Sequence, residues 1–237
     1  MKRSPEFILG AVLFFALGAA AGGFGPSLWK KNQPIPGFEA KGASERELYQ
    51  GYYKAYRQKQ ADIVMLGDSL TCFVNWSELL GRADVAGRGL RFQSAEGLLG
   101  LLPDVEALSP RTCFIMIGVN DLLHRSKPVF EVFSSYRKLV TELRAKGIVP
   151  VIQSTLPVAR SRQDSARVNA DIAALNGLLR RLAAQEGIAY LDLVSDLAGD
   201  GYLADAFTYD GIHLTGAGYG VWGERVLSFL AAGNRTE

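Results

Sequence analysis

Apolar residues along the chain fall into two alternating patterns. Short runs rich in branched side chains are typical of buried strands, and longer stretches with apolar positions three or four apart are typical of helices. Strands are expected at residues 63–66, 84–86, 113–118, 149–154 and 188–193, and helices at residues 44–60, 70–80, 94–108, 129–146, 164–186 and 216–232. Single strands separated by helices pair in parallel through right-handed crossovers. The pattern therefore predicts a three-layer α/β/α sandwich around a mostly parallel five-stranded sheet.

The N-terminal residues 1–29 follow a different pattern. Lys2 and Arg3 precede an apolar stretch that begins at Phe7 and passes into small residues, which is the layout of an export signal. As a helix, the stretch from Phe7 to Trp29 would be about 34 Å long, enough to cross a hydrocarbon core of about 30 Å. We favour an uncleaved anchor with a cytoplasmic N-terminus over a cleaved signal, and we expect export of the remaining chain in either case.

The rest of the chain divides into a linker and one domain. Residues 30–43 contain Pro34, Pro36 and Gly37, which are typical of a linker. Residues 44–237 are long enough to form a single domain with a substantial core.

Composition narrows the function. A net charge of +2 gives no indication of a nucleic-acid partner. Two histidines are too few for a multi-histidine metal site, so neither a metal nor an organic cofactor is expected. Cys72 and Cys113 have no metal-site spacing, and we expect free buried thiols, although export permits a disulfide. The sequence does not indicate an oligomeric state.

Three polar motifs lie where expected strands end or the last helix begins. Gly67-Asp68-Ser69 follows the first strand, Gly118-Val119-Asn120-Asp121 follows the third, and Asp210-Gly211-Ile212-His213 precedes the last helix. A serine nucleophile needs a base within hydrogen-bond reach, and the base needs a carboxylate to hold its tautomer. Ser69, His213 and Asp210 fill these roles, since the other histidine, His124, is expected in a loop. Asn120 and the Ser69 N–H would stabilise an oxyanion.

These motifs resemble those of the SGNH, or GDSL-type, family of esterases and lipases, over nearly all of the domain. The resemblance implies that Ser69 is the nucleophile, that Asp210 and His213 are the acid and base, and that Asn120 lines the oxyanion hole. One block departs from the family. Where members read Asn-Arg-Gly-Ile-x-Gly-Asp-Thr, this chain has Gly87-Arg88-Gly89-Leu90-Arg91-Phe92-Gln93-Ser94, so that Phe92 occupies the oxyanion glycine position and Gly87 the asparagine position.

A phenylalanine adopts a positive φ at some cost, and its ring is expected to crowd the acyl pocket. We predict that Phe92 still donates its N–H to the oxyanion and that its side chain restricts the acyl group to a small one. Arg88 and Arg91 are candidates for binding an anionic substrate. Asp68 is expected to hold the loop beside Ser69. The tyrosines of the first helix are expected to pack on the domain or on a membrane surface; they are Tyr49, Tyr52, Tyr53 and Tyr56.

The sequence thus predicts an exported serine esterase that acts on short acyl esters, with a small-molecule or cell-envelope substrate. It would contact a membrane through its N-terminal helix if that helix is not cleaved. Two alternatives remain open. An acyltransferase would use the same triad with a sugar or lipid hydroxyl in place of water. A non-catalytic binding module would have kept the fold but lost the activity, as the changes at Phe92 and Gly87 suggest.

Overall fold

The computed structural model describes residues 44–124 and 127–233. Five parallel strands form one sheet in the order β2-β1-β3-β4-β5. The strands are β1 (Ile63–Gly67), β2 (Val85–Gly89), β3 (Thr112–Met116), β4 (Val149–Gln153) and β5 (Ala189–Leu191). The central strands β1 and β3 are apolar and buried, except for Thr112 at the start of β3, because both of their faces are covered. The expected α/β/α sandwich is therefore confirmed.

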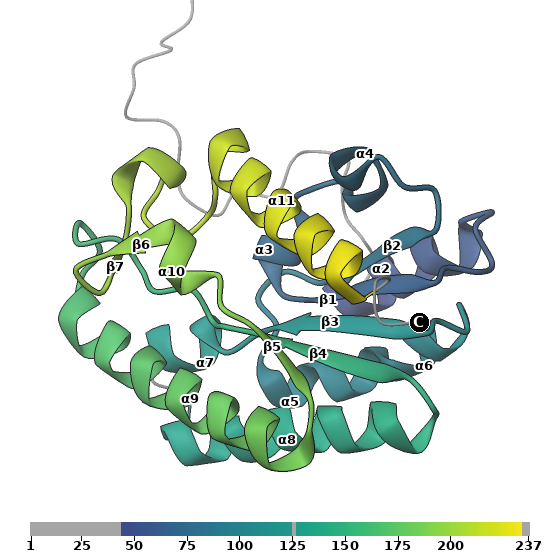
Figure 1. The fold of residues 1–237 in the computed structure, drawn as a ribbon, viewed down its shortest axis with the longest axis horizontal. Coiled ribbons are helices and arrows are strands. Elements are labelled where there is room, and N and C mark those ends of the chain that lie inside the picture. Colours follow the sequence, from purple (N-terminus) through teal and green to yellow (C-terminus); the bar gives the residue numbers. More distant parts are fainter. Residues whose placement is uncertain (1–43, 125–126, 234–237) are drawn as a thin grey trace, which may run out of the picture. The chain divides into compact units, whose positions relative to one another are not determined.

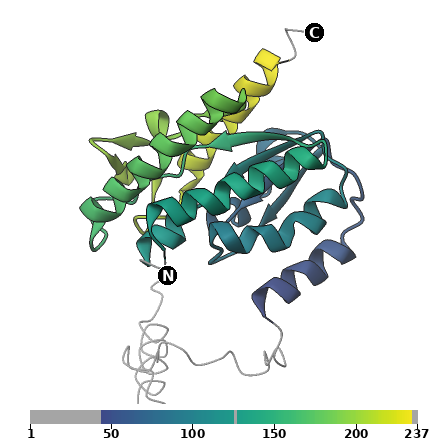
Figure 2. The same ribbon diagram turned by 90° about the horizontal axis from the view of Figure 1, so that it is seen from below.

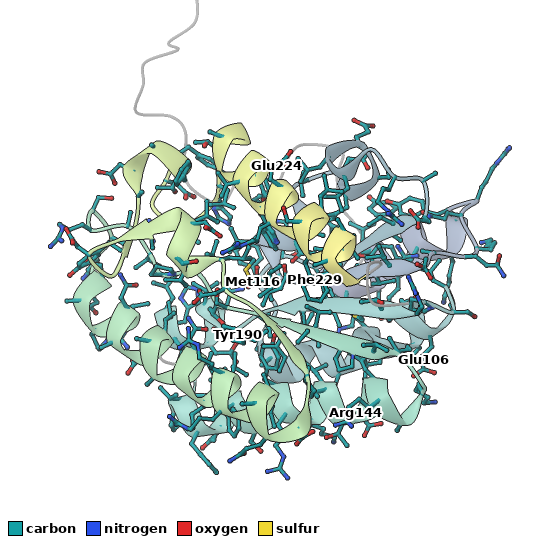
Figure 3. All side chains as sticks on the ribbon, viewed as in Figure 1. Glu106, Met116, Arg144, Tyr190, Glu224 and Phe229 are labelled. Carbon is teal, nitrogen blue, oxygen red and sulfur yellow. The ribbon has the colours of Figure 1, made fainter. Side chains whose placement is uncertain are left out.

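Helices cover both faces of the sheet (Figures 1 and 2). One face carries α3 (Ser69–Cys72), α4 (Trp76–Leu80) and α11 (Gly216–Gly233), and the other carries α5 (Ala95–Leu98), α8 (Val129–Ala145) and α9 (Ser165–Glu186). The ring of Phe229 on α11, labelled in Figure 3, packs on that of Phe114 on β3, with 5.6 Å between centroids. The remaining helices are α2 (Glu45–Ala55), η3 (Leu99–Leu101), α6 (Leu102–Glu106), α7 (Val119–Leu123), α10 (Val194–Leu197) and η4 (Asp205–Phe207).

Three expected helices differ from those in the structure. The helix expected at 70–80 is two short helices, because Asn75 starts a new one by accepting the Glu78 N–H. The helix expected at 94–108 is likewise divided, at η3, shortly before Pro103. Helix α2 begins as expected, with a capping box between Ser44 and Glu47, but it ends at Ala55.

A small hairpin was absent from the sequence expectations. Strands β6 (Ala198–Gly199) and β7 (Tyr202–Leu203) pair antiparallel around Asp200 and Gly201, which have φ of 52° and 81°. Asp-Gly is the residue pair that a two-residue hairpin turn favours, so this signal was present in the sequence.

No helix within residues 44–124 and 127–233 is long and apolar enough to cross a membrane. The anchor or signal expected at residues 1–29 and the linker expected at 30–43 lie outside the described residues.

Candidate active site

The candidate site lies at the carboxyl ends of β1 and β3. The chain leaves these neighbouring strands in different directions, to β2 on one side and to β4 on the other. In open parallel sheets, such a switch in strand order opens a crevice for ligands. Ser69 follows β1 directly, and Asn120 lies in α7, just beyond β3.

The turn that carries Ser69 leaves no room for a side chain at Gly67. A Cβ on Gly67 would lie 2.2 Å from the Thr71 hydroxyl oxygen and 2.4 Å from the Met116 carbonyl oxygen. The Asp68 carboxylate accepts the Leu70 N–H at 3.0 Å and so caps α3, which is the loop-holding role expected for it. Burial raises the pKa of Asp68 to about 7, the Leu70 N–H opposes this rise, and the Asp121 carboxylate adds to it.

Ser69, His213 and Asp210 form a hydrogen-bonded chain. Ser69 Oγ lies 3.0 Å from His213 Nε2, and His213 Nδ1 lies 2.6 Å from Asp210 Oδ2. The other Asp210 oxygen accepts the backbone N–H groups of Ile212 and His213 at 2.9 and 2.8 Å. Burial disfavours the charge on Asp210, but the hydrogen bonds from His213 and Ile212 outweigh it and hold the pKa of this carboxyl below its usual value. The carboxylate is therefore placed to orient the imidazole.

Both local and long-range hydrogen bonds hold the His213 loop and the helix that follows it. The Thr208 hydroxyl donates to the His213 carbonyl at 2.8 Å, and the Ala159 N–H donates to the Gly211 carbonyl at 2.8 Å. Tyr219 on α11 donates its hydroxyl to the carbonyl of Leu70 at 2.7 Å. This last bond joins the helix that follows His213 to the helix that begins at Ser69.

A hydrogen bond joins Asn120 to the loop of Phe92, two of the three expected oxyanion donors. Asn120 Nδ2 donates one hydrogen to the Gln93 carbonyl at 3.0 Å, which ties Asn120 to the loop that contains Phe92. Three donors have no acceptor among the described residues: the second amide hydrogen of Asn120 and the backbone N–H groups of Ser69 and Phe92. Phe92 has φ of 55°, the left-handed conformation that glycine adopts at less cost. Its ring is 67% exposed.

The two candidate arginines lie in different environments. Arg91 is exposed, and its guanidinium lies 5.7 Å from the Phe73 ring centroid and 5.0 Å from that of Phe92. Arg88 is only 4% exposed and stacks on Tyr53 at 4.4 Å, and its expected role in binding an anionic substrate stays a prediction. The sequence did not reveal this, because Arg88 lies between two glycines that show no facing pattern.

Two aromatic residues at the site were missed in the sequence. The centroid of the Phe73 ring lies 5.0 Å from that of the His213 ring, and Tyr209 also stacks on His213, at 5.9 Å with 20° between the ring planes. Both rings are exposed. The Phe92 ring lies beside the same Arg91 guanidinium as the Phe73 ring, and we call Phe73, Phe92 and Tyr209 the aromatic rim. The position of Tyr209 immediately before Asp210 was the only available signal.

Other sequence candidates lie outside the triad. His124 is exposed at the end of α7, as expected for a loop residue. Cys72 and Cys113 are free thiols. Tyr53 is buried, and Tyr52 and Tyr56 are exposed, so the tyrosine face packs only partly on the domain. In the part of the chain that the structure describes, no group of three or more histidine, cysteine or carboxylate side chains is arranged to hold a metal ion.

Comparisons with known proteins identify a family and a shared fold. The profile of the GDSL-like lipase/acylhydrolase family matches residues 65–221. A GDSL-like lipase from Bacteroides thetaiotaomicron superposes with a TM-score of 0.69 at 22% identity, covering 79% of this chain and 97% of that one. An acetyl xylan esterase gives a TM-score of 0.61 at 20% identity, covering 71% and 99% of the two chains. A lipase/acylhydrolase from Enterococcus faecalis gives 0.64 at 20% identity, covering 72% and 95%.

A curated relative matches only in part. An N-acylneuraminate cytidylyltransferase from Streptococcus agalactiae is 30% identical over 168 residues, which are 71% of this chain. The chain spans only 38% of the length of that protein. The relative's name therefore gives no information on the reaction of this chain.

Proposed function

The chain belongs to the GDSL-like lipase/acylhydrolase family and is an ester hydrolase; from that premise we propose that Ser69, His213 and Asp210 carry out the hydrolysis. His213 Nε2 takes the Ser69 proton as Oγ bonds to the ester carbonyl carbon. The resulting oxyanion collapses to an acyl-enzyme on Ser69, and the alcohol leaves with the proton that His213 returns. His213 then deprotonates a water molecule, which attacks the acyl carbon. The acid leaves, and His213 returns the proton to Ser69 Oγ.

One observation carries this proposal, namely the continuous hydrogen bonding from Ser69 through His213 to Asp210 at 3.0 and 2.6 Å. The Asp210 carboxylate orients the ring and stabilises the imidazolium that forms during attack. Free donors on Ser69, Phe92 and Asn120 support an oxyanion hole, in which each donor is worth about a hundredfold in rate or more. This complete set of groups argues against a non-catalytic binding module.

We extend the proposal to the substrate and the location. Short acyl groups are favoured because Phe92 replaces the glycine expected in the oxyanion loop. Within the aromatic rim, Phe73 and Tyr209 would contact the alcohol part of the ester. Export is supported by the basic and apolar pattern of residues 1–29, and N-terminal sequencing of the mature protein would distinguish a cleaved signal from an anchor.

The test uses the full-length chain with p-nitrophenyl acetate, butyrate and octanoate. We expect the wild type to hydrolyse the acetate fastest, and Ser69→Ala to lose at least about a thousandfold in kcat/KM. Ser134→Ala is the matched control, because Ser134 is an exposed serine on α8. A fluorophosphonate should label the wild type and the control but not Ser69→Ala.

Equal activity in the wild type and Ser69→Ala would overturn the role of Ser69. A rate that rises with chain length would instead leave the triad intact and overturn the preference for short acyl groups. Adding sugar or lipid alcohols as acceptors would distinguish hydrolysis from acyl transfer, because both reactions share the acyl-enzyme.

A further inference from the structure

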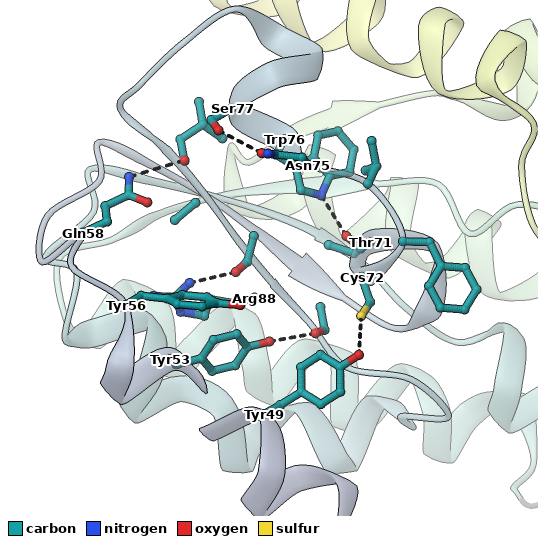
Figure 4. A pocket seen from close by; sticks show the side chains of 16 residues that line it. Tyr49, Tyr53, Tyr56, Gln58, Thr71, Cys72, Asn75, Trp76, Ser77 and Arg88 are labelled. Atoms are coloured by element: carbon teal, nitrogen blue, oxygen red, sulfur yellow. Dashed lines mark hydrogen bonds between the residues drawn. The ribbon is translucent and has the colours of Figure 1, made fainter. Parts of the chain in front are cut away.

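A second pocket lies beside the outer edge of β2. It has a volume of about 450 Å³ and lies between the tyrosines of α2, the segment 71–77 that follows Ser69, and β2 itself (Figure 4). None of the triad residues lines it. Phe73 forms part of its wall and also contacts His213, so the pocket adjoins the candidate active site without being part of it.

The edge strand presents hydrogen-bond donors to this pocket. In a parallel ladder alternate residues face the neighbouring strand, and Asp84 already faces β1 by accepting the Ile63 N–H. The backbone groups of Val85, Gly87 and Gly89 therefore point outward. Their carbonyls accept from Gln58 Nε2 at 3.4 Å, Arg88 Nη1 at 2.8 Å and the Tyr53 hydroxyl at 2.7 Å, respectively.

The outward N–H groups of Gly87 and Gly89 are left over. They have no acceptor among the described residues. The acceptors of this edge are thus occupied by side chains, whereas the N–H groups of Gly87 and Gly89 are free of protein acceptors in the described part of the chain.

Arg88 adds a buried positive charge that forms no ion pair with a carboxylate of the described residues. Among the described residues that line the pocket, it is the one charged side chain. Asp104 offers Arg88 only its backbone carbonyl, at 3.3 Å, and the Asp104 carboxylate accepts from Gln50 instead. Burial lowers the pKa of Arg88, but an arginine remains charged. A buried charge is normally paired, so this guanidinium lacks a partner that its surroundings call for.

We propose that this pocket binds an oxyanion group, a carboxylate or a phosphate, through Arg88 and the free N–H groups of Gly87 and Gly89. A planar guanidinium and adjacent backbone N–H groups are the donors that recognise such oxygens. The site does not depend on the chemistry of Ser69. The bound anion would contact residues 71–73, which begin two positions after Ser69.

The test titrates the full-length protein with inorganic phosphate and, separately, with acetate, while chloride keeps the ionic strength constant. The signal is tryptophan fluorescence, since Trp76 lines the pocket, and isothermal calorimetry provides a second measurement. We expect saturable binding that Arg88→Gln weakens by about tenfold or more. Arg137→Gln, on the exposed side of α8, is the matched control and should bind as the wild type does.

Because Arg88 is buried, a second pair of variants leaves it in place. Ser77→Asp puts a carboxylate on the pocket wall and should weaken anion binding, whereas the neutral Ser77→Asn should not. Binding of phosphate alone would assign a phosphate site, and binding of both anions a general oxyanion site. No saturable binding of either anion, or unchanged binding in Arg88→Gln and Ser77→Asp, would overturn the proposal. The experiment measures anion binding and not esterase activity, so its outcome does not depend on the proposed role of Ser69.

Discussion

Phe92 combines a strained backbone with an exposed side chain. Its φ of 55° is a conformation that strains any residue with a Cβ but not glycine. The residue is 67% exposed, so its ring buries little apolar surface. Phe92→Gly and Phe92→Ala both remove the ring, but only the alanine keeps the strain. We therefore expect Phe92→Gly to be more stable than Phe92→Ala by about 1 kcal/mol in urea unfolding. Equal stabilities would mean that the loop relaxes around alanine at no cost.

For single residues, the chemical requirements of a catalytic triad predicted more of the candidate site than the hydrophobic pattern of the sequence did. Ser69, His213 and Asp210 could be chosen together because a nucleophile, a base and a carboxylate must occur as a set. The structure places them within hydrogen-bond reach. No such requirement connects Arg88 or Phe73 to the site. The positions of these residues depend on which way a strand or a loop faces, and neighbouring glycines and turns hide that from the sequence.

Among the secondary-structure elements, the short helix α3 depends on a close approach to β2. A Cβ on Gly89 would lie 2.4 Å from the Cys72 backbone nitrogen, so Gly89→Ala must push α3 and Ser69 away from the sheet. We expect a loss of about 2–4 kcal/mol in unfolding free energy and of about a hundredfold in kcat/KM.

Gly51→Ala is the matched control for that substitution. Gly51 lies in the interior of α2, is exposed, and has no atom within 4 Å of an added Cβ. Alanine should therefore stabilise the protein by about 0.5–1 kcal/mol through helix propensity, with activity unchanged. If both alanine variants behaved alike, the contact between α3 and β2 would not be the reason for the glycine.

Long elements were predictable and short ones were not. Helices α8 and α9 begin and end within one residue of the expected 129–146 and 164–186, because their apolar stripes run over many turns. The break at Asn75 and the helix α7 depend instead on single caps and turns. The break at Asn75 also includes a local bond that the hydrophobic pattern does not show, from Trp76 Nε1 to the Thr71 carbonyl at 2.8 Å.

For the whole molecule, strand alternation predicted the layers but not the strand order. The order β2-β1-β3-β4-β5 places β1 beside β3, and this brings Ser69 and Asn120 to one crevice. His213 reaches the same crevice from the far end of the chain. Its alignment with Ser69 therefore depends on contacts between segments that no local pattern in the sequence relates.

The hydrogen bond from the Tyr219 hydroxyl to the Leu70 carbonyl is the clearest such contact. Tyr219→Phe leaves that buried carbonyl unpaired, which should cost about 1–2 kcal/mol of stability. Because the bond joins α11 to α3, we also expect kcat to fall by about three- to tenfold, with KM little changed. Tyr136→Phe is the matched control, since buried Tyr136 donates to the Ile115 carbonyl at 2.6 Å but does not touch the triad or its loops.

Both variants should lose similar stability in urea unfolding, and only Tyr219→Phe should lose kcat on p-nitrophenyl acetate. A structural role alone would lower the stability of both and leave both rates intact. Equal kcat values in the two variants would therefore show that α11 does not position His213 against Ser69. A selective loss in Tyr219→Phe would instead establish that the C-terminal helix sets the geometry of a nucleophile 150 residues earlier in the chain, counted from Tyr219 back to Ser69.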